Sequence, residues 1–179
     1  LHDALPIYKT ASNALNKIAD LSIRGGRNKP IKIFSIEQAE KELERCESMG
    51  VEVISYLDAQ FPPLLKNIDD CPALLFCKGN VDLLTKDTVA IVGSRNASVN
   101  GMRLAHKIAK ELADNDRVIV SGFARGIDTA AHKASIEKGT IAVLAGGVDH
   151  IYPPENKELY AEVLSKGLIV AELPLGSIP

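Results

Sequence analysis

The segment Val89-Ala90-Ile91-Val92-Gly93-Ser94-Arg95 joins a short apolar run to a glycine and an arginine. Similar junctions occur twice more, where Val118–Val120 precedes Ser121–Gly126 and where Ile141–Leu144 precedes Ala145–Gly147. Short runs of β-branched and apolar residues are typical of parallel strands that are buried on both faces. Parallel strands end at one edge of a sheet, where open α/β sheets bind ligands, so the three loops predict one shared binding edge.

Helical patterns fill the intervals between these runs. The apolar periodicity predicts alternating strands and helices, namely strands over 89–92, 117–120, 140–144 and 168–171 and helices over about 100–115, 126–138 and 154–166. Strands and helices that alternate at this length form right-handed βαβ crossovers. The fold class predicted is therefore α/β, with a Rossmann-like, doubly wound and mostly parallel sheet.

The residues before this region contain helices, a linker and two further strands. Ser35 and Gln38 form a capping box for a helix that ends at Gly50. The other elements expected here are a helix over Thr10–Ala19, a basic linker over 23–30, strands over 51–55 and 73–77, and a short helix at Pro62 and Pro63. We therefore expect residues 1–30 to hold a remnant of a helical region with its linker, and residues 31–179 to form the Rossmann-like domain.

Composition narrows the class of protein. The chain has 179 residues with 46% hydrophobic residues and a net charge of −2, values that fit a soluble globular domain and argue against nucleic-acid binding through global charge alone. Between Arg95 and Lys138, however, eight basic and five acidic side chains give a local net charge of +3. Aromatic residues are only 4% of the chain and Trp is absent, which disfavours a base-stacking platform of several rings.

Cysteine usage and motif content predict a protein without bound cofactor or metal. Three cysteines without CxxC spacing indicate neither a disulfide framework nor a zinc site, and we expect them reduced in a cytoplasmic protein. Neither a GxGxxG after a strand nor a GxxxxGK[ST] motif occurs, and no run reaches transmembrane length. The chain begins at Leu1 rather than Met, so we expect a fragment.

The first two loops carry the candidate site residues. Glycine permits close approach to the backbone, serine offers a hydroxyl and arginine a planar fork that matches phosphate oxygens. The N–H groups at a helix start add a further anion site. The residues with these properties are Gly93, Ser94, Arg95, Ser121, Gly122, Arg125 and Gly126.

Two polar residues follow the second loop on one helical face, four positions apart. Asp128 fits a capping role better than a catalytic one, and His132 fits a packing role better than membership of a catalytic Asp–His pair. His150 and Tyr152 in the third loop lack the partners of a metal site. We therefore predict no catalytic constellation.

These motifs together resemble a known family. The segments that carry the resemblance are Ala90–Arg95, Ser121–His132, Thr140–Gly147, Tyr152–Asn156, Ala171–Pro174 and the upstream stretch Tyr56–Asn80. They closely resemble the DNA-processing protein A family (DprA, also called Smf), over roughly residues 11 to 179. The resemblance implies an extended Rossmann-like fold that binds single-stranded DNA without sequence preference, protects incoming DNA and helps load the RecA recombinase in natural transformation.

The resemblance also bears on sites and assembly. It implies that Arg95 and Arg125 meet DNA phosphates while the glycines and serines of the two loops shape the pocket. Lys133 joins this set from its helical position only. The family is not known as an enzyme and forms homodimers through later portions. Its pattern continues into an Arg-Asn-Arg segment and a further Gly-rich loop that this chain lacks, so we expect the domain to be incomplete at its C-terminus and weaker in DNA binding.

Two alternatives stay open at this point. Related Rossmann-like folds include nucleotide phosphoribohydrolases of the lysine-decarboxylase-like group, which place a mononucleotide at the same edge, and Glu172 is the candidate acid for such an enzyme. A protein-interaction scaffold, in which the arginines are only surface charge, is the other alternative.

Overall fold

In the computed structural model, residues 11–179 are described, and the chain divides after Lys41 into two compact units. The first unit holds α2 (Ala11–Arg24) and the beginning of α3 (Ile36–Ser48). Thr10, where the first helix was expected to begin, lies outside the described residues. The helix continues to Arg24, so the linker expected over 23–30 was placed too early. The predicted domain boundary at residue 30 stays a prediction.

The capping box at the start of α3 is confirmed. The Ser35 N–H donates to Gln38 Oε1 at 3.0 Å, and the Gln38 N–H donates to Ser35 Oγ at 3.2 Å. Each side chain thus satisfies a backbone donor that the first helical turn leaves without an intrahelical partner.

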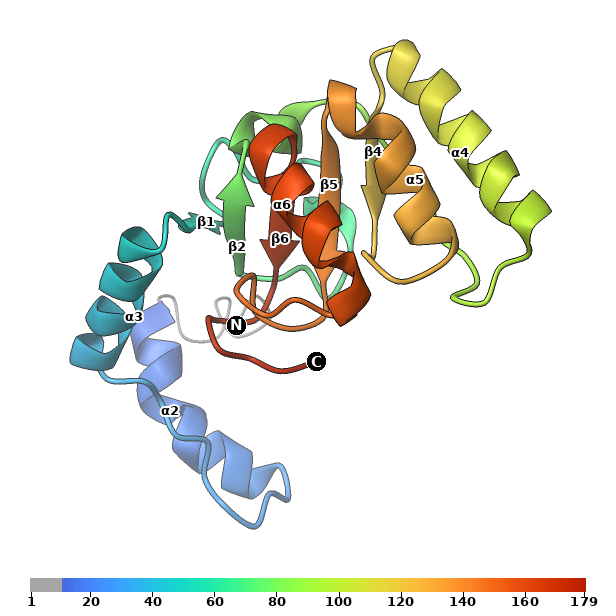
Figure 1. The fold of residues 1–179 in the computed structure, drawn as a ribbon. Coiled ribbons are helices and arrows are strands. Elements are labelled where there is room, and N and C mark those ends of the chain that lie inside the picture. Colours follow the sequence, from blue (N-terminus) through green and yellow to red (C-terminus); the bar gives the residue numbers. More distant parts are fainter. Residues whose placement is uncertain (1–10) are drawn as a thin grey trace. The chain divides into compact units, whose positions relative to one another are not determined.

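The second unit is built on a six-stranded sheet with the strand order β1-β2-β6-β5-β4-β3 (Figure 1). Its strands are β1 (Glu52–Ser55), β2 (Leu74–Gly79), β3 (Thr88–Ala90), β4 (Val118–Ser121), β5 (Thr140–Leu144) and β6 (Leu168–Ala171). Strands β3 to β6 pair in parallel, whereas β2 pairs antiparallel with both β1 and β6. The predicted Rossmann-like, mostly parallel α/β class is confirmed.

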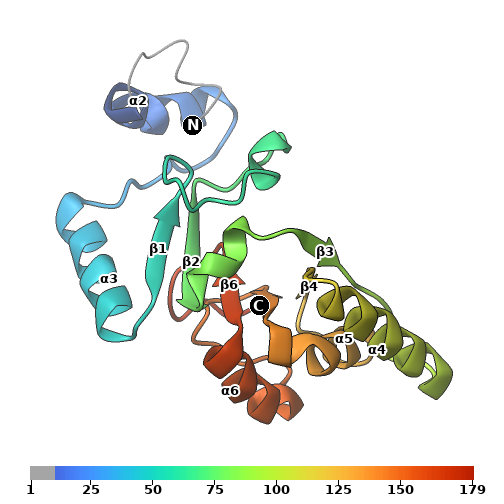
Figure 2. The same ribbon diagram turned by 90° about the horizontal axis from the view of Figure 1, so that it is seen from above.

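Three helices connect the parallel strands, namely α4 (Val99–Asp114), α5 (Ile127–Ser135) and α6 (Lys157–Lys166). Strands β3, β4, β5 and β6 follow one another across the sheet in sequence order. Right-handed crossovers in one constant direction place all connecting helices on the same face. Figures 1 and 2 show α4, α5 and α6 together on that face. Short 3-10 helices complete the unit at η2 (Leu65–Asn67), η3 (Val81–Thr85), η4 (Ile136–Lys138) and η5 (Pro154–Asn156).

Strands β5 and β6 lie between two apolar cores. Ala142 and Ile169 face the core beneath α6, whereas Ile141 and Val170 face a second core that includes Phe61. Burial on both faces is what their uninterrupted apolar sequence predicts. The expectation was wrong for the first run, because β3 ends at Ala90 and Val92 is 71% exposed.

The face of the sheet opposite the helices carries an apolar groove of about 770 Å³. Val120, Val143 and Val170 line it from three neighbouring strands. We call it the opposite-face groove. Glu172, which follows β6, also lines it.

Cys46, Cys71 and Cys77 are free, and burial raises the pKa of the Cys77 thiol to about 12. Among residues 11–179, no helix is both long and apolar enough to cross a membrane.

His132 packs inside the second unit, as the sequence predicts. Its ring is fully buried, and Nδ1 lies 2.8 Å from Thr140 Oγ1. The Thr140 hydroxyl donates its own proton to the Ile119 carbonyl at 2.8 Å, so His132 Nδ1–H must be the donor in the pair. Burial lowers the pKa of His132 to about 4 from 6.5, against the opposing influence of the Asp128 carboxylate.

This shift predicts an acid-sensitive fold. Between pH 6.5 and 4 the unfolded chain binds a proton at His132 that the folded chain excludes, so the free energy of unfolding falls as the pH falls through this window. Between pH 7 and pH 5, His132 should lower the free energy of unfolding by about 2 kcal/mol. Urea unfolding at the two pH values measures it. His132→Asn keeps a donor near Thr140, and its free energy of unfolding should lack this pH-dependent loss. The control His106→Asn, at an exposed histidine, should still show the loss. Equal pH dependence in both variants would contradict the assignment.

Candidate functional site

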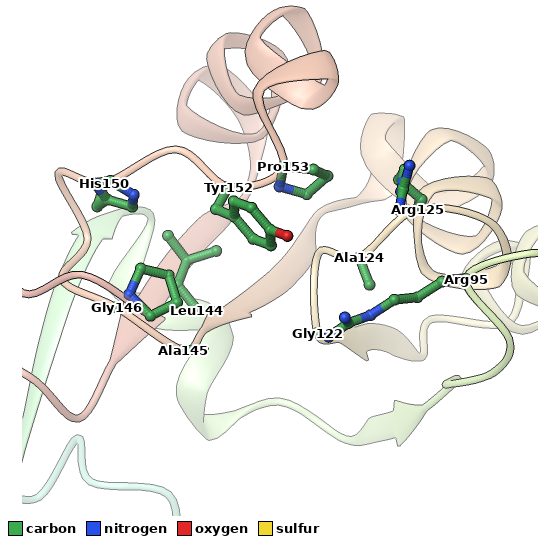
Figure 3. Close-up of a pocket in the computed structure, with 11 residues that line it drawn as sticks. Arg95, Gly122, Ala124, Arg125, Leu144, Ala145, Gly146, His150, Tyr152 and Pro153 are labelled. Atoms are coloured by element: carbon green, nitrogen blue, oxygen red, sulfur yellow. The ribbon is translucent and has the colours of Figure 1, made fainter.

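Loops from three neighbouring parallel strands meet at the carboxyl edge of the sheet and form a small cleft (Figure 3). Arg95 comes from the loop after β3, and Gly122 and Arg125 come from the loop after β4. His150 and Tyr152 come from the loop after β5. The cleft has a volume of about 100 Å³, and we call it the arginine cleft. The predicted convergence of the three loops is therefore observed.

The two arginines give the cleft its charge. Arg95 is exposed and takes part in no ion pair within the described part of the chain. Arg125 Nη1 lies 3.8 Å from Glu155 Oε1, and both side chains of this pair are more than half exposed. Exposed pairs of this kind contribute little free energy, so Glu155 holds Arg125 only weakly. Both guanidinium groups are thus accessible to an anion.

The Asp128 carboxylate joins the first two loops. Asp128 is only 4% exposed, at the start of α5. Its Oδ1 accepts the Gly93 N–H at 3.3 Å, and its Oδ2 accepts the Gly122 and Ala124 N–H groups at 3.1 and 3.3 Å. A buried carboxylate requires such partners, because an unpaired charge in the interior is costly. Asp128 lies in the first turn of α5, where a carboxylate is favoured by the helix dipole, but its carboxylate bonds the two loops and does not cap the helix.

Glycines permit this close arrangement. Gly126 has φ +77°, and a Cβ there would lie 2.8 Å from the Arg95 carbonyl oxygen. A Cβ on Gly93 would lie 2.7 Å from Ile127 Cγ1. The two loops therefore pack against each other and against α5 as only glycine allows. These two glycines thus serve internal packing, and the approach of a ligand to their backbone stays a prediction.

The loop that presents Arg125 is anchored on its other side as well. Phe123 is buried with φ +61°, a conformation that is rare outside glycine. Asn156 Nδ2 donates to the Phe123 carbonyl at 2.9 Å, and the Thr129 hydroxyl donates to the Ala124 carbonyl at 2.8 Å. These bonds from α5 and η5 fix the backbone of the two residues that precede the arginine.

The predicted site residues divide into four groups. Arg95, Gly122 and Arg125 line the arginine cleft. Gly126 and Lys133 line a different groove, between α4 and α5. Gly93 and Ser94 form the loop beneath Arg95, where Ser94 Oγ accepts the Asn96 N–H. Ser121 turns away from the edge, because its buried hydroxyl donates to the Ile91 carbonyl at 2.6 Å.

Several backbone N–H groups at and before the start of α5, which were predicted to receive an anion, are bonded within the protein. The Gly93, Gly122 and Ala124 N–H groups bond to Asp128, and the Ile127 N–H donates to the Ser94 carbonyl at 3.3 Å. An anion in the arginine cleft would therefore be held mainly by side chains.

Tyr152 and His150 are two polar residues of the cleft that were not assigned to the site from the sequence. Tyr152 is 53% exposed, and Figure 3 shows its hydroxyl directed toward the side that carries the arginines. In the sequence, only their position in the loop after the third apolar run could have indicated that they lie at this edge. Glu172, the candidate acid of the alternative enzyme, lines the opposite-face groove and not the arginine cleft.

A Rossmann-like sheet with two arginines at its carboxyl edge defines a class of α/β proteins that can bind anions there. Within this class, residues 52–179 match the family model described as DNA recombination-mediator protein A. The chain is also 41% identical to the DNA processing protein DprA of Streptococcus pneumoniae over 172 residues, and 41% identical to that of Bacillus subtilis over 146 residues. The chain belongs to the DprA/Smf family.

Two solved structures share the fold. The X-ray structure of DprA from Streptococcus pneumoniae superposes with a TM-score of 0.70 at 36% identity, covering 90% of this chain and 58% of the other. A structure of DNA processing protein A from Helicobacter pylori, which addresses its single-stranded DNA binding mode, gives a TM-score of 0.64 at 32% identity over 72% and 58% of the two chains. The matches with the curated Streptococcus and Bacillus relatives cover 92% and 78% of this chain but only 58% and 49% of theirs.

Asp128 predicts a measurable contribution to stability. In Asp128→Asn one acceptor oxygen is replaced by an amide that faces an N–H donor, so at least one of the three loop bonds is lost. We expect the free energy of unfolding to fall by about 1–3 kcal/mol, because a buried donor is left without a partner. Urea denaturation measures the change. Asp82→Asn, at an exposed aspartate, is the control and should change little; a loss of equal size there would contradict the role of Asp128.

Proposed function

We propose that this chain binds single-stranded DNA through the arginine cleft. The observation that carries the proposal is the convergence of Arg95 and Arg125, from two different loops, on one cleft at the carboxyl edge of the sheet. Guanidinium groups bind phosphate oxygens with two parallel hydrogen bonds. Side chains that bind phosphate and sugar hold a strand without reading its bases, so we propose binding that tolerates any sequence.

The shape of the cleft favours an extended single strand. About 100 Å³ is smaller than the roughly 300–1,000 Å³ of pockets that enclose a whole small ligand, but it accommodates a phosphate group. The exposed ring of Tyr152 in the same cleft offers a stacking face to an unpaired base. The Helicobacter relative, whose single-stranded DNA binding mode has been addressed structurally, supports this assignment.

Family membership supports a proposal on the wider biological role. We propose that the protein takes part in DNA processing during natural transformation, protecting incoming strands and assisting RecA loading, and that the family's homodimer forms in the longer protein. These roles involve the whole length of the relatives, of which this chain matches about half. We further propose that it acts by binding rather than by catalysis, because Glu172 lies apart from the arginine cleft.

Fluorescence anisotropy with labelled oligo-dT tests the DNA proposal directly. We expect Arg95→Glu to lower the affinity at low salt at least about tenfold. The slope of log affinity against log salt concentration, called the salt slope below, should fall in magnitude by about 1 for one lost phosphate contact. The matched control is Lys86→Glu, which makes the same charge change beside the opposite-face groove and should have a much smaller effect. The same sequence as a duplex should bind more weakly than the single strand.

Two results would contradict the proposal. Unchanged affinity in Arg95→Glu would remove the arginine cleft from the interface. An equal loss in Lys86→Glu would show that binding responds to net charge and not to this site.

A variant of Glu155 tests the proposal through an expected gain in DNA affinity. This carboxylate lies 3.8 Å from Arg125 and repels an incoming phosphate. We therefore expect Glu155→Gln to raise the affinity for oligo-dT about two- to fivefold at low salt, in line with the small free energies of exposed pairs. Anisotropy titrations measure this, with Glu162→Gln, on the exposed side of α6, as the control. Weaker binding in Glu155→Gln would place the phosphate path elsewhere.

A further inference from the structure

A second groove lies beside the arginine cleft, between α4 and α5. It has a volume of about 420 Å³, and we call it the α4–α5 groove. Its basic lining residues are Arg103, His106 and Lys133, and Val99 and Met102 contribute apolar surface. The first two basic residues come from the early turns of α4, and Lys133 comes from α5.

The charge of this groove is not compensated. No acidic residue is among the described residues that line it, and neither Arg103 nor Lys133 takes part in an ion pair within residues 11–179. The two lysines of α4 are paired instead, since Lys107 lies 3.8 Å from Glu111 and Lys110 lies 2.9 Å from Asp114. The two unpaired cations thus lie in the groove, Arg103 on α4 and Lys133 on α5, which makes the groove complementary to an anion.

The α4–α5 groove continues from the arginine cleft. Arg125 lines the cleft and the next residue, Gly126, lines the groove. Gly126 in turn packs against the backbone of Arg95. Figure 1 shows α4 and α5 side by side, with both helices starting at the edge where the strands end. The two hollows therefore share one wall, formed by the loops that carry both arginines.

We propose that the α4–α5 groove binds the continuation of the same DNA strand beyond the arginine cleft. This inference rests on the proposed function. Arg103 and Lys133 would contact backbone phosphates, and His106 would line the path. Val99, whose side chain is 59% exposed, offers apolar surface to a sugar or base. A basic groove that includes apolar surface is the arrangement by which proteins follow a single strand without reading it. A DNA strand is favoured over a small anion, because two basic hollows that share a wall can hold successive phosphates of one strand.

Oligonucleotide length tests this inference. We compare oligo-dT of about 4 nucleotides, which can occupy the arginine cleft alone, with oligo-dT of about 20 nucleotides, which can reach both sites. In the double variant Arg103→Glu with Lys133→Glu, we expect the affinity for the long oligonucleotide to fall about tenfold and its salt slope to fall by about 2. Binding of the short oligonucleotide should stay unchanged.

The matched control is Lys107→Glu with Lys110→Glu, which makes the same change in net charge on α4 outside the groove. This control should lower the affinity for the long and the short oligonucleotide by a similar, small factor. The neutral variant Arg103→Gln with Lys133→Gln should give a smaller loss for the long oligonucleotide, and thermal unfolding confirms that each variant is folded.

The outcomes separate the two proposals. Equal losses for both lengths, or equal losses in the control variant, would overturn the α4–α5 groove as part of the path. Unchanged long-oligonucleotide binding in the double variant, together with loss of binding of both lengths in Arg95→Glu, would overturn the groove but leave the proposed function standing. Failure of the unaltered protein to bind either length would overturn the proposed function itself.

Discussion

The hydrogen bonds of Asp128 are the interaction on which the binding edge depends. One buried carboxylate accepts N–H groups from the loops after β3 and after β4, which are separated by the whole of α4. A charge removed from water is tolerated only when donors surround it, so the loops cannot move apart without exposing a costly group. Because Arg95 and Arg125 belong to these loops, their convergence follows from a residue that itself lines neither hollow.

This arrangement also determines how an anion can be bound. In many nucleotide-binding proteins the backbone N–H groups at a helix start hold the phosphate. Here the Asp128 carboxylate accepts the Gly122 and Ala124 N–H groups of the loop before α5, and the Ile127 N–H at the helix start donates to the Ser94 carbonyl. Phosphate binding is then left to the arginine side chains, which are exposed. Such contacts are electrostatic and independent of sequence, in keeping with a protein that holds a strand without reading it.

The elements could be predicted from the sequence where local physics decides them, and the site could be predicted only in part. Strands β5 and β6 were predicted with the correct bounds because burial on both faces makes their sequences uniformly apolar. Ser121 was misassigned because the direction of a side chain at a strand end depends on a partner 30 residues away, the Ile91 carbonyl. Glu172 could have been placed correctly, since alternation along β6 puts it on the same side as Val170, away from α6. No local pattern reveals that Asp128 occupies the loop donors.

The one-sided arrangement of helices separates the binding edge from the apolar face of the sheet. The opposite-face groove, lined by Val120, Val143 and Val170, is bordered by the short 3-10 helices η2 and η3, whereas α4, α5 and α6 lie on the other face (Figure 1). The arginine cleft and the α4–α5 groove, in contrast, are formed by loops and helices between Arg95 and Pro153, with Pro179 as an additional neighbour of the cleft. Asp128, Thr129 and Asn156, which hold these loops, belong to the same continuous region. Arg95 and Arg125 are therefore positioned by contacts within residues 88–171, whereas the loop that carries Tyr152 is also held from outside this range, by Arg45, Gly176 and Ser177.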